Sequence, residues 1–231
     1  GTLRNLMLLF SRGPIRQKIA RFSVQAKVVL VMTAGLLVLG TVLFFVLEFH
    51  NLLGGLSLGD RLLVSFFQSV TPRTAGFNTV NFSQLRTPTL MLGVMLMFIG
   101  AAPGSTGGGI KVTTLAILLG TVISTARGKT RLEFFRRTIA VKVLYQTIVV
   151  ITVYLFVAAL VSFLLSITED YGRPLDLIFE TISALGTVGL STGVTPHLSM
   201  AGKILIIITM FLGRIGPFTL AVAIGQRKLT E

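Results

Sequence analysis

The stretch Thr71-Pro72-Arg73-Thr74-Ala75-Gly76-Phe77-Asn78-Thr79 decides the fold, because its pattern returns later in the chain as Gly186-Thr187-Val188-Gly189-Leu190-Ser191-Thr192. Each copy follows a short apolar run, residues 62–70 and residues 175–185. Runs of this length cannot cross a bilayer, since a spanning helix needs about 20 apolar residues. We therefore expect both runs to enter the membrane as short pore helices and to turn back.

The offset that relates Gly76 to Gly189 also relates residues well outside these two loops. Phe66 corresponds to Phe179, and Gly100 corresponds to Gly213. Because internal repeats decide the fold before local detail does, the sequence predicts one unit that occurs twice in tandem. Each unit is expected to contain an outer helix, a re-entrant pore helix, a Thr-x-Gly loop and an inner helix. The expected fold class is an all-α membrane protein with extended loops after the pore helices.

The composition excludes an ordinary soluble domain. The chain has 231 residues, of which 52% are hydrophobic and 13% are charged, whereas soluble proteins have about 25% charged residues. Its mean hydropathy is +0.86. The chain contains no cysteine, which excludes a disulfide framework and a thiolate metal site.

The positions of the charges predict the topology. Fourteen of the 21 basic residues lie before the first span, between the two units or at the C-terminus, and six of the eight acidic residues lie in the segments between them. By the positive-inside rule, both termini and the linker are cytoplasmic and each unit crosses the membrane twice. We expect a multi-pass protein of the cell membrane. The basic clusters are interpreted as topology signals and not as a nucleic-acid site.

The expected division of the chain follows from these spans. The predicted outer helices cover residues 28–47 and 141–165, and the second inner helix covers residues 202–225. The chain begins without methionine, which is typical of the interior of a longer polypeptide. The segments are a cytoplasmic N-terminal segment (1–27), the first unit (28–126), a basic cytoplasmic linker (127–140), the second unit (141–226) and a cytoplasmic tail (227–231).

The first inner helix, residues 88–126, is interrupted by Ala101-Ala102-Pro103-Gly104-Ser105-Thr106-Gly107-Gly108-Gly109. No helix continues through four glycines and a proline, so we predict a helix broken at membrane depth. Such backbone is tolerated only where it is buried in protein or faces a water-filled cavity. The repeat offset places Arg214 opposite Ala101, so the arginine and the interrupted stretch are expected to be partners at one depth.

The two Thr-x-Gly loops suit a dehydrated cation. Backbone carbonyl oxygens can replace the hydration shell of an ion if a loop holds them toward one axis. Gly76 and Gly189 allow the backbone conformations that a Cβ would resist. The pore helices also direct their partly negative C-terminal ends at the loops, which favours a cation and disfavours an anion.

The residues Thr187-Val188-Gly189 match the start of the K⁺-channel signature, and the whole arrangement resembles the Trk/Ktr/HKT superfamily of K⁺ transporters. The resemblance covers the C-terminal half of that family, its third and fourth units, and implies a K⁺-channel-like pore for K⁺ uptake. It implies that K⁺ is bound by the filter backbone and that a glycine-rich loop and an arginine form a gate. The implied filter residues are Thr74, Ala75, Gly76, Phe77, Thr187, Val188, Gly189 and Leu190, and the implied gate residues are Pro103, Gly104, Ser105, Thr106, Gly107, Gly108, Gly109 and Arg214.

The resemblance also implies partners. Two units cannot encircle an axis, so the other units come from missing sequence or from a second copy of the chain. The family commonly forms homodimers and binds a cytosolic nucleotide-binding regulatory subunit. Membrane lipid surrounds the protein, K⁺ is the transported ion, and no cofactor is implied for this chain.

Other functions remain open at this stage. A carrier with an occluded site at the membrane midplane is one alternative, and a non-conducting half-pore or assembly subunit is another. Arg214 has a structural alternative too, since a buried charge can connect two helices away from the pore. An enzyme is not expected, because His50 and His197 lie in different loops and Gly104–Lys111 lacks the adjacent Gly-Lys of a Walker loop.

Overall fold

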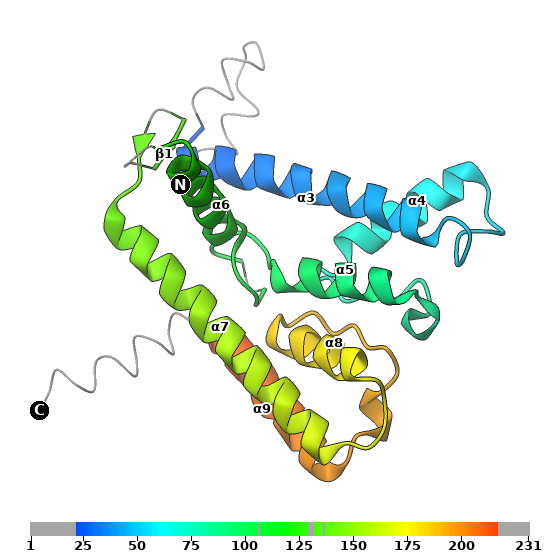
Figure 1. The fold of residues 1–231 in the computed structure, drawn as a ribbon. Helices are drawn as coiled ribbons and strands as arrows, with labels where there is room; N and C mark the ends of the chain where they lie inside the picture. The colour runs from blue at the N-terminus through cyan, green and yellow to red at the C-terminus, as the bar shows by residue number, and fades with distance from the viewer. Residues whose placement is uncertain (1–21, 106, 129–131, 136, 217–231) are drawn as a thin grey trace, which may run out of the picture.

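The computed structural model describes residues 22–105, 107–128, 132–135 and 137–216. The predominantly helical fold predicted from the sequence is confirmed (Figure 1). The expectations for residues 1–21, for Thr106 and for residues 217–231 lie outside the described residues. The helices are α3 (Val24–Glu48), α4 (Leu58–Val70), α5 (Thr87–Phe98), α6 (Val112–Ala126), α7 (Val141–Thr168), α8 (Pro174–Leu185) and α9 (Met200–Ile215), with 3₁₀ turns at Phe82–Gln84 and Thr195–His197.

Helices α3 and α7 are long and apolar enough to cross a membrane. They contain 25 and 28 residues, with mean hydropathies of 2.6 and 2.9 over their most apolar windows. Only 17% and 22% of those windows are buried inside the protein. Their apolar surfaces therefore face outward, which suits contact with lipid. Both helices cover the predicted outer spans and extend beyond them by a few residues.

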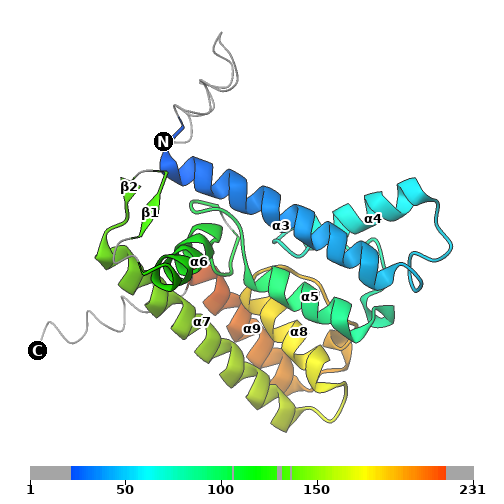
Figure 2. The ribbon, with the colours of Figure 1, turned by 45° about the horizontal axis from the view of Figure 1, so that its top comes forward.

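The helices form two groups that follow the chain (Figures 1 and 2). Helix α3 packs on α4, α5 and α6, whereas α8 packs on α7 and α9. Helix α8 also packs on α5, which joins the two groups. The fully buried ring of Phe179 lies at this junction, where a Cβ built on Gly93 would be 3.2 Å from the ring. A side chain at position 93 would therefore require the Phe179 ring to shift, and glycine allows α5 and α8 to approach closely here.

Two buried glutamates connect each long helix to the start of the next inner helix. Glu48 accepts hydrogen bonds from the backbone N of Arg86, at 3.0 Å, and from the Thr89 hydroxyl. Glu169 accepts from the backbone N and the hydroxyl of Ser199, at 2.8 and 2.6 Å. A carboxylate satisfies the free N–H groups of a helix start and interacts favourably with its dipole. These two contacts fix the inner helices α5 and α9 at one end.

The interrupted inner helix has a defined structure at the break. Helix α5 ends at Phe98 and α6 begins at Val112. The two edges of the break pair with each other, since Gly100 N donates to Ile110 O at 2.9 Å and Ile110 N donates to Phe98 O at 3.0 Å. The segment 99–111, which we call the break loop, is therefore closed at its base by backbone hydrogen bonds.

Two local features differ from the expectation. The linker contains a short antiparallel ladder, β1 (Glu133–Phe134) with β2 (Arg137–Thr138), which the all-α interpretation did not include. Helix α9 ends at Ile215, before the expected limit of 225. The reason is local, because Gly216 adopts φ +86° and precedes Pro217. A residue before proline avoids the helical region, and glycine with positive φ commonly ends a helix.

Acid should weaken the contact between α7 and α9. Burial alone would raise the pKa of Glu169, but the hydrogen bonds from Ser199 and Thr168 outweigh it and hold that pKa below its ordinary value. The ionised carboxylate therefore stabilises the fold fully above about pH 4.3, the pKa of an unperturbed glutamate, and this contribution is lost as pH falls through the lower pKa of the folded protein.

We expect E169Q to lower Tm at pH 7 by about 2–4 °C, for a loss of about 1 kcal/mol. Thermal unfolding in detergent measures this, and the difference from the wild type should shrink as pH decreases toward 3. The control is D170N, because Asp170 is exposed beside the same helix end. A Tm difference that stays constant from pH 7 to pH 3 would contradict the assignment.

Candidate ion-binding site

Two loops that follow the short helices α4 and α8 lie directly against each other. We call residues 71–79 the first glycine loop and residues 186–192 the second glycine loop. A Cβ built on Gly76 would lie 2.0 Å from the carbonyl oxygen of Val188, a distance that no side chain permits. The two loops are thus in backbone contact, and only glycine at position 76 allows it.

The backbone of both loops alternates in the same way. Thr74 and Gly76 have φ of +71° and +74°, and Thr187 and Gly189 have φ of +54° and +90°. Glycine accepts such angles without cost, but a β-branched residue there is a genuine outlier. Strained backbone of this kind is held by the surrounding structure and clusters at functional sites. An alternating backbone can present successive carbonyl groups on one side, as a cation site requires.

The residue after each glycine is anchored to the preceding helix. Thr71 Oγ1 donates to the carbonyl oxygen of Phe77 at 2.8 Å, and Ser183 Oγ donates to that of Leu190 at 2.6 Å. These two oxygens are therefore engaged by the helix side of the loops. The anchoring hydroxyls bond only the carbonyl groups of Phe77 and Leu190. The other implied filter residues, Thr74 to Gly76 and Thr187 to Gly189, do not take part in these two bonds.

The break loop packs onto Thr74 of the first glycine loop and onto Thr187 of the second. Gly108 N donates to Thr187 Oγ1 at 2.7 Å. A Cβ on Gly107 would lie 2.7 Å from Thr74 Oγ1, and a Cβ on Gly108 would lie 2.9 Å from Gly186 O. Three loops that are far apart in the sequence therefore meet here, and the glycines of the break loop are required by this close contact.

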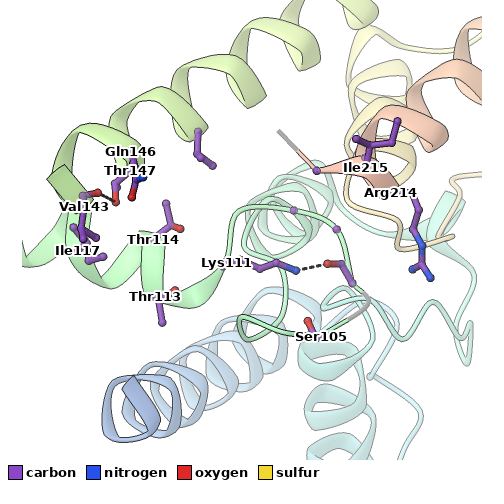
Figure 3. A pocket seen from close by; sticks show the side chains of 16 residues that line it. Ser105, Lys111, Thr113, Thr114, Ile117, Val143, Gln146, Thr147, Arg214 and Ile215 are labelled. Carbon is purple, nitrogen blue, oxygen red and sulfur yellow. Dashed lines mark hydrogen bonds between the residues drawn. The ribbon is translucent and has the colours of Figure 1, made fainter. Parts of the chain in front are cut away.

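A cavity of about 620 Å³ lies beside the break loop (Figure 3). Lys111 points into it from the start of α6 and donates to the carbonyl oxygen of Gly107, and Arg214 lines it from the end of α9. Cations at membrane depth are costly and mark functional positions. The polar side chains that line this cavity are those of Ser105, Lys111, Thr113, Thr114, Gln146, Thr147 and Arg214.

Arg214 also lines a second cavity, of about 730 Å³, which includes Glu180 and the residues from Thr187 to Ser191 of the second glycine loop. The arginine is thus placed between this loop and the cavity beside the break loop. The sequence offset indicated a common depth for Arg214 and the break loop, and the structure brings both to the first cavity.

Two residues of the site, Lys111 and Glu180, are not predicted by the sequence pattern. The hydrogen bond to the break-loop carbonyl comes from Lys111, which the sequence reasoning considered only as part of a Walker pattern. A charged residue beside an apolar helix was the available signal. Glu180 was treated only as a topology signal, yet it is 5% exposed and bonded to the second glycine loop.

A family model described as "TrkH: Cation transport protein" matches residues 4–229. The chain belongs to this family. It is 43% identical over 209 residues to Ktr system potassium uptake protein B of Bacillus subtilis, covering 90% of this chain and 47% of that protein. It is 39% identical over 206 residues to the potassium/sodium uptake protein NtpJ of Enterococcus hirae, covering 87% and 46%.

The fold of the family is also seen in a solved structure. The crystal structure of the potassium transporter TrkH from Vibrio parahaemolyticus matches with a TM-score of 0.68 at 22% identity, covering 83% of this chain and 43% of that one. The chain therefore spans less than half the length of these relatives. The family consists of cation transport proteins and not of enzymes. Among the described residues, no group of three His, Cys, Asp or Glu side chains could hold a metal ion.

The two loop glycines should differ in their tolerance of a side chain. G76A combines positive φ with a clash against Val188 O, so we expect a loss of about 3 kcal/mol or more. No described atom lies within 4 Å of a Cβ on Gly189, so G189A should cost only the backbone strain of about 1–2 kcal/mol. Thermal unfolding of the two variants in detergent measures the difference, and equal losses would contradict the loop contact.

Proposed function

We propose that the chain forms half of a K⁺-selective pore in the cell membrane and that it serves K⁺ uptake. The observation that carries this proposal is the matched pair of glycine loops, which touch each other and share left-handed backbone at the threonine and at the glycine. Each loop supplies one quarter of a ring of carbonyl oxygens from Thr74 to Gly76 and from Thr187 to Gly189. Phe77 and Leu190 complete the filter by anchoring it to α4 and α8.

The surrounding helices favour a cation at this ring. Helices α4 and α8 end at Val70 and Leu185, immediately before the loops. Their C-terminal ends carry partial negative charge. Matching element order in 24–98 and 141–215 supports a duplicated unit of outer helix, pore helix, filter loop and inner helix. Named relatives that take up potassium, or potassium and sodium, support K⁺ as the transported ion.

The break loop and Arg214 form the gate in this proposal. The loop packs against Thr74 and Thr187, directly beside the start of both filter segments. It closes the path by filling it, and its glycines, Gly104 and Gly107 to Gly109, supply backbone that can rearrange. Arg214 and Lys111 add two positive charges to the adjoining cavity, which repel a cation at a depth where solvent screens them weakly.

The remaining parts of the pore come from outside this chain. The relatives are about twice as long, so two further units in the same polypeptide, or a second copy of the chain, complete the ring. We further propose a homodimer with cytoplasmic termini and linker, surrounded by membrane lipid. The relative from Bacillus subtilis is named as protein B of a Ktr system, and this name implies further proteins in that system. It supports our proposal of a cytosolic nucleotide-binding regulatory subunit as partner.

Serine at position 189 should weaken ion discrimination. G189S introduces a side chain and a hydroxyl at the carbonyl ring, at a position where no described atom obstructs it. We expect the preference for K⁺ over Na⁺ to fall by about tenfold, equivalent to about 1.4 kcal/mol. Ion flux through the complete transporter in proteoliposomes measures this.

The same flux measurement on the wild type separates a pore from a carrier. A carrier would show saturable flux at rates too low for a pore.

The matched control is G193S. Gly193 also has positive φ and open space around its Cα, but it lies beyond the second glycine loop. This variant carries the same substitution and the same type of strain, so its ion preference should remain that of the wild type. Unchanged K⁺ over Na⁺ discrimination in G189S would contradict the filter assignment.

Removing the gate should raise K⁺ flux. R214A deletes a positive charge that borders both cavities, and deletion of residues 107–109 removes the segment that packs on the threonines. We expect a several-fold increase in each variant at equal membrane levels, measured as K⁺ uptake by the complete transporter. The control is K203A, which removes a charge from an exposed position of the same helix. Flux that fails to rise in both variants, with expression intact, would contradict the gate.

A further inference from the structure

A buried carboxylate on α8 holds the outer part of the second glycine loop. Glu180 Oε1 accepts hydrogen bonds from Ser191 Oγ at 2.5 Å and from Thr192 N at 3.0 Å. Its Oε2 accepts from Thr195 Oγ1 at 2.6 Å. The side chain is only 5% exposed. All three donors are neutral, and all three follow Gly189 in the sequence.

Glu180 acts together with Ser183 from one face of the helix. The two residues are three positions apart, a spacing that places their side chains on the same side of an α-helix. Ser183 holds the carbonyl of Leu190, and Glu180 holds the next two residues of the loop. The chain beyond Gly189 is therefore fastened to α8 from Leu190 to Thr192 and again at Thr195.

The first unit has a comparable arrangement without the charge, shifted by one residue along its helix. Thr71 holds the carbonyl of Phe77, and Gln68, three positions earlier, donates through Nε2 to Thr79 Oγ1 at 2.8 Å. Thr79 corresponds to Thr192 at the same offset that relates Gly76 to Gly189, whereas Gln68 corresponds to Thr181, so the anchoring residue lies one position later on α4 than on α8. The Gln68 Oε1 atom has no hydrogen-bond partner within the part of the chain that the structure describes. The residue three positions before the hydroxyl anchor is thus neutral in the first unit and a carboxylate in the second.

A carboxylate and an amide are not equivalent at position 180. An ionised glutamate offers two acceptor oxygens, whereas glutamine offers one acceptor oxygen and an NH₂ group that only donates. Glutamine there would leave at least one of the three present donors without its acceptor. Hydrogen bonds to an ionised acceptor are also shorter and stronger than neutral ones. Glu180 and residues Thr187 to Ser191 border the same cavity, so the charge lies beside the filter segment.

We propose that Glu180 is a positioning residue of the filter, which fixes the second glycine loop for K⁺ and gives this unit a negative charge where the first unit has Gln68. This inference rests on the proposed pore function. The carboxylate does not touch the ion, because its oxygens are engaged by Ser191, Thr192 and Thr195. It acts through the loop, by holding the backbone beyond Gly189, and through its field, which favours a cation in the ring.

The test is E180Q in the complete transporter, with K⁺ and Na⁺ uptake measured in a bacterial strain that lacks its own K⁺ uptake systems. We expect KM for K⁺ to rise about tenfold, from the loss of one charge-assisted hydrogen bond, with weaker discrimination against Na⁺ and unchanged membrane levels. E180D keeps the charge and should restore part of the discrimination. A merely structural role would lower protein levels and maximal uptake while KM and ion preference stayed the same.

Two control variants test whether an effect of E180Q comes from the hydrogen bonds of Glu180 or from the loss of any negative charge on α8. D176N removes a carboxylate one turn away on the same helix, where the bonds go to Arg173, so its KM and ion preference should match the wild type. T195V removes one donor to Glu180 and should shift KM in the same direction by a smaller factor. If E180Q fails to reach the membrane, the T195V variant provides the test. A KM for K⁺ in T195V equal to that of the wild type would overturn the inference.

The outcomes also separate this inference from the pore itself. A wild-type transporter that takes up no K⁺ would overturn the proposed function, and the role of Glu180 with it. Wild-type uptake together with an unchanged KM and ion preference in E180Q would overturn the role of Glu180 alone. A defect in D176N equal to that in E180Q would also overturn it, because the effect would then belong to any charge on α8.

Discussion

The structure depends on the close backbone contact of three loops, in which no Cβ fits. Gly76 lies against Val188 O, Gly108 lies against Gly186 O, and Gly213 of α9 lies against Leu185 O, where a Cβ would be 2.2 Å from the oxygen. Irregular backbone at membrane depth must have its polar groups satisfied inside the protein, since lipid offers none. The hydroxyls of Thr71, Ser183 and Thr187 and the side chains of Lys111 and Glu180 provide these partners. Glycine permits the approach, and the polar side chains make it stable.

The two units share their scaffold but differ in their charges. Both tie the end of a long helix to the next inner helix through a buried glutamate, and both anchor the residue after the loop glycine by a hydroxyl. Within the described residues, only the second unit places a carboxylate behind its glycine loop, and only the first has an inner helix broken by a glycine-rich loop, with Lys111 bonded within it. In the proposed pore, this division puts an attractive charge beside the filter segment of the second unit and positive charge beside the break loop.

Much of this arrangement was predictable from sequence because it depends on local rules. Uninterrupted apolar runs predicted α3 and α7, and the run of glycines with Pro103 predicted the break between α5 and α6. The unusual φ of Gly76 and Gly189 followed from their repeated position. The remainder depends on tertiary contacts that no local pattern encodes. Thr187 adopts positive φ in contact with Gly108, a partner 79 positions away. The role of Glu180 also appears only when the loop folds back along its own helix.

The contact between Gly108 N and Thr187 Oγ1 also links the proposed gate to the proposed filter. The break loop cannot leave the filter threonines without breaking this bond, and a larger movement must break the bond from Lys111 to Gly107 O. Each such bond contributes about 0.5–1.5 kcal/mol net, and more when one partner is charged. If the break loop opens as proposed, breaking these two bonds costs a few kcal/mol, which corresponds to a minor open population of about 0.1–10%. A regulator needs only a comparable difference in affinity to reverse that balance. Because Thr187 would lose its contact in the same step, the proposed gate opening is coupled to the conformation of the second glycine loop through this hydrogen bond and the packing of Gly108 on Gly186.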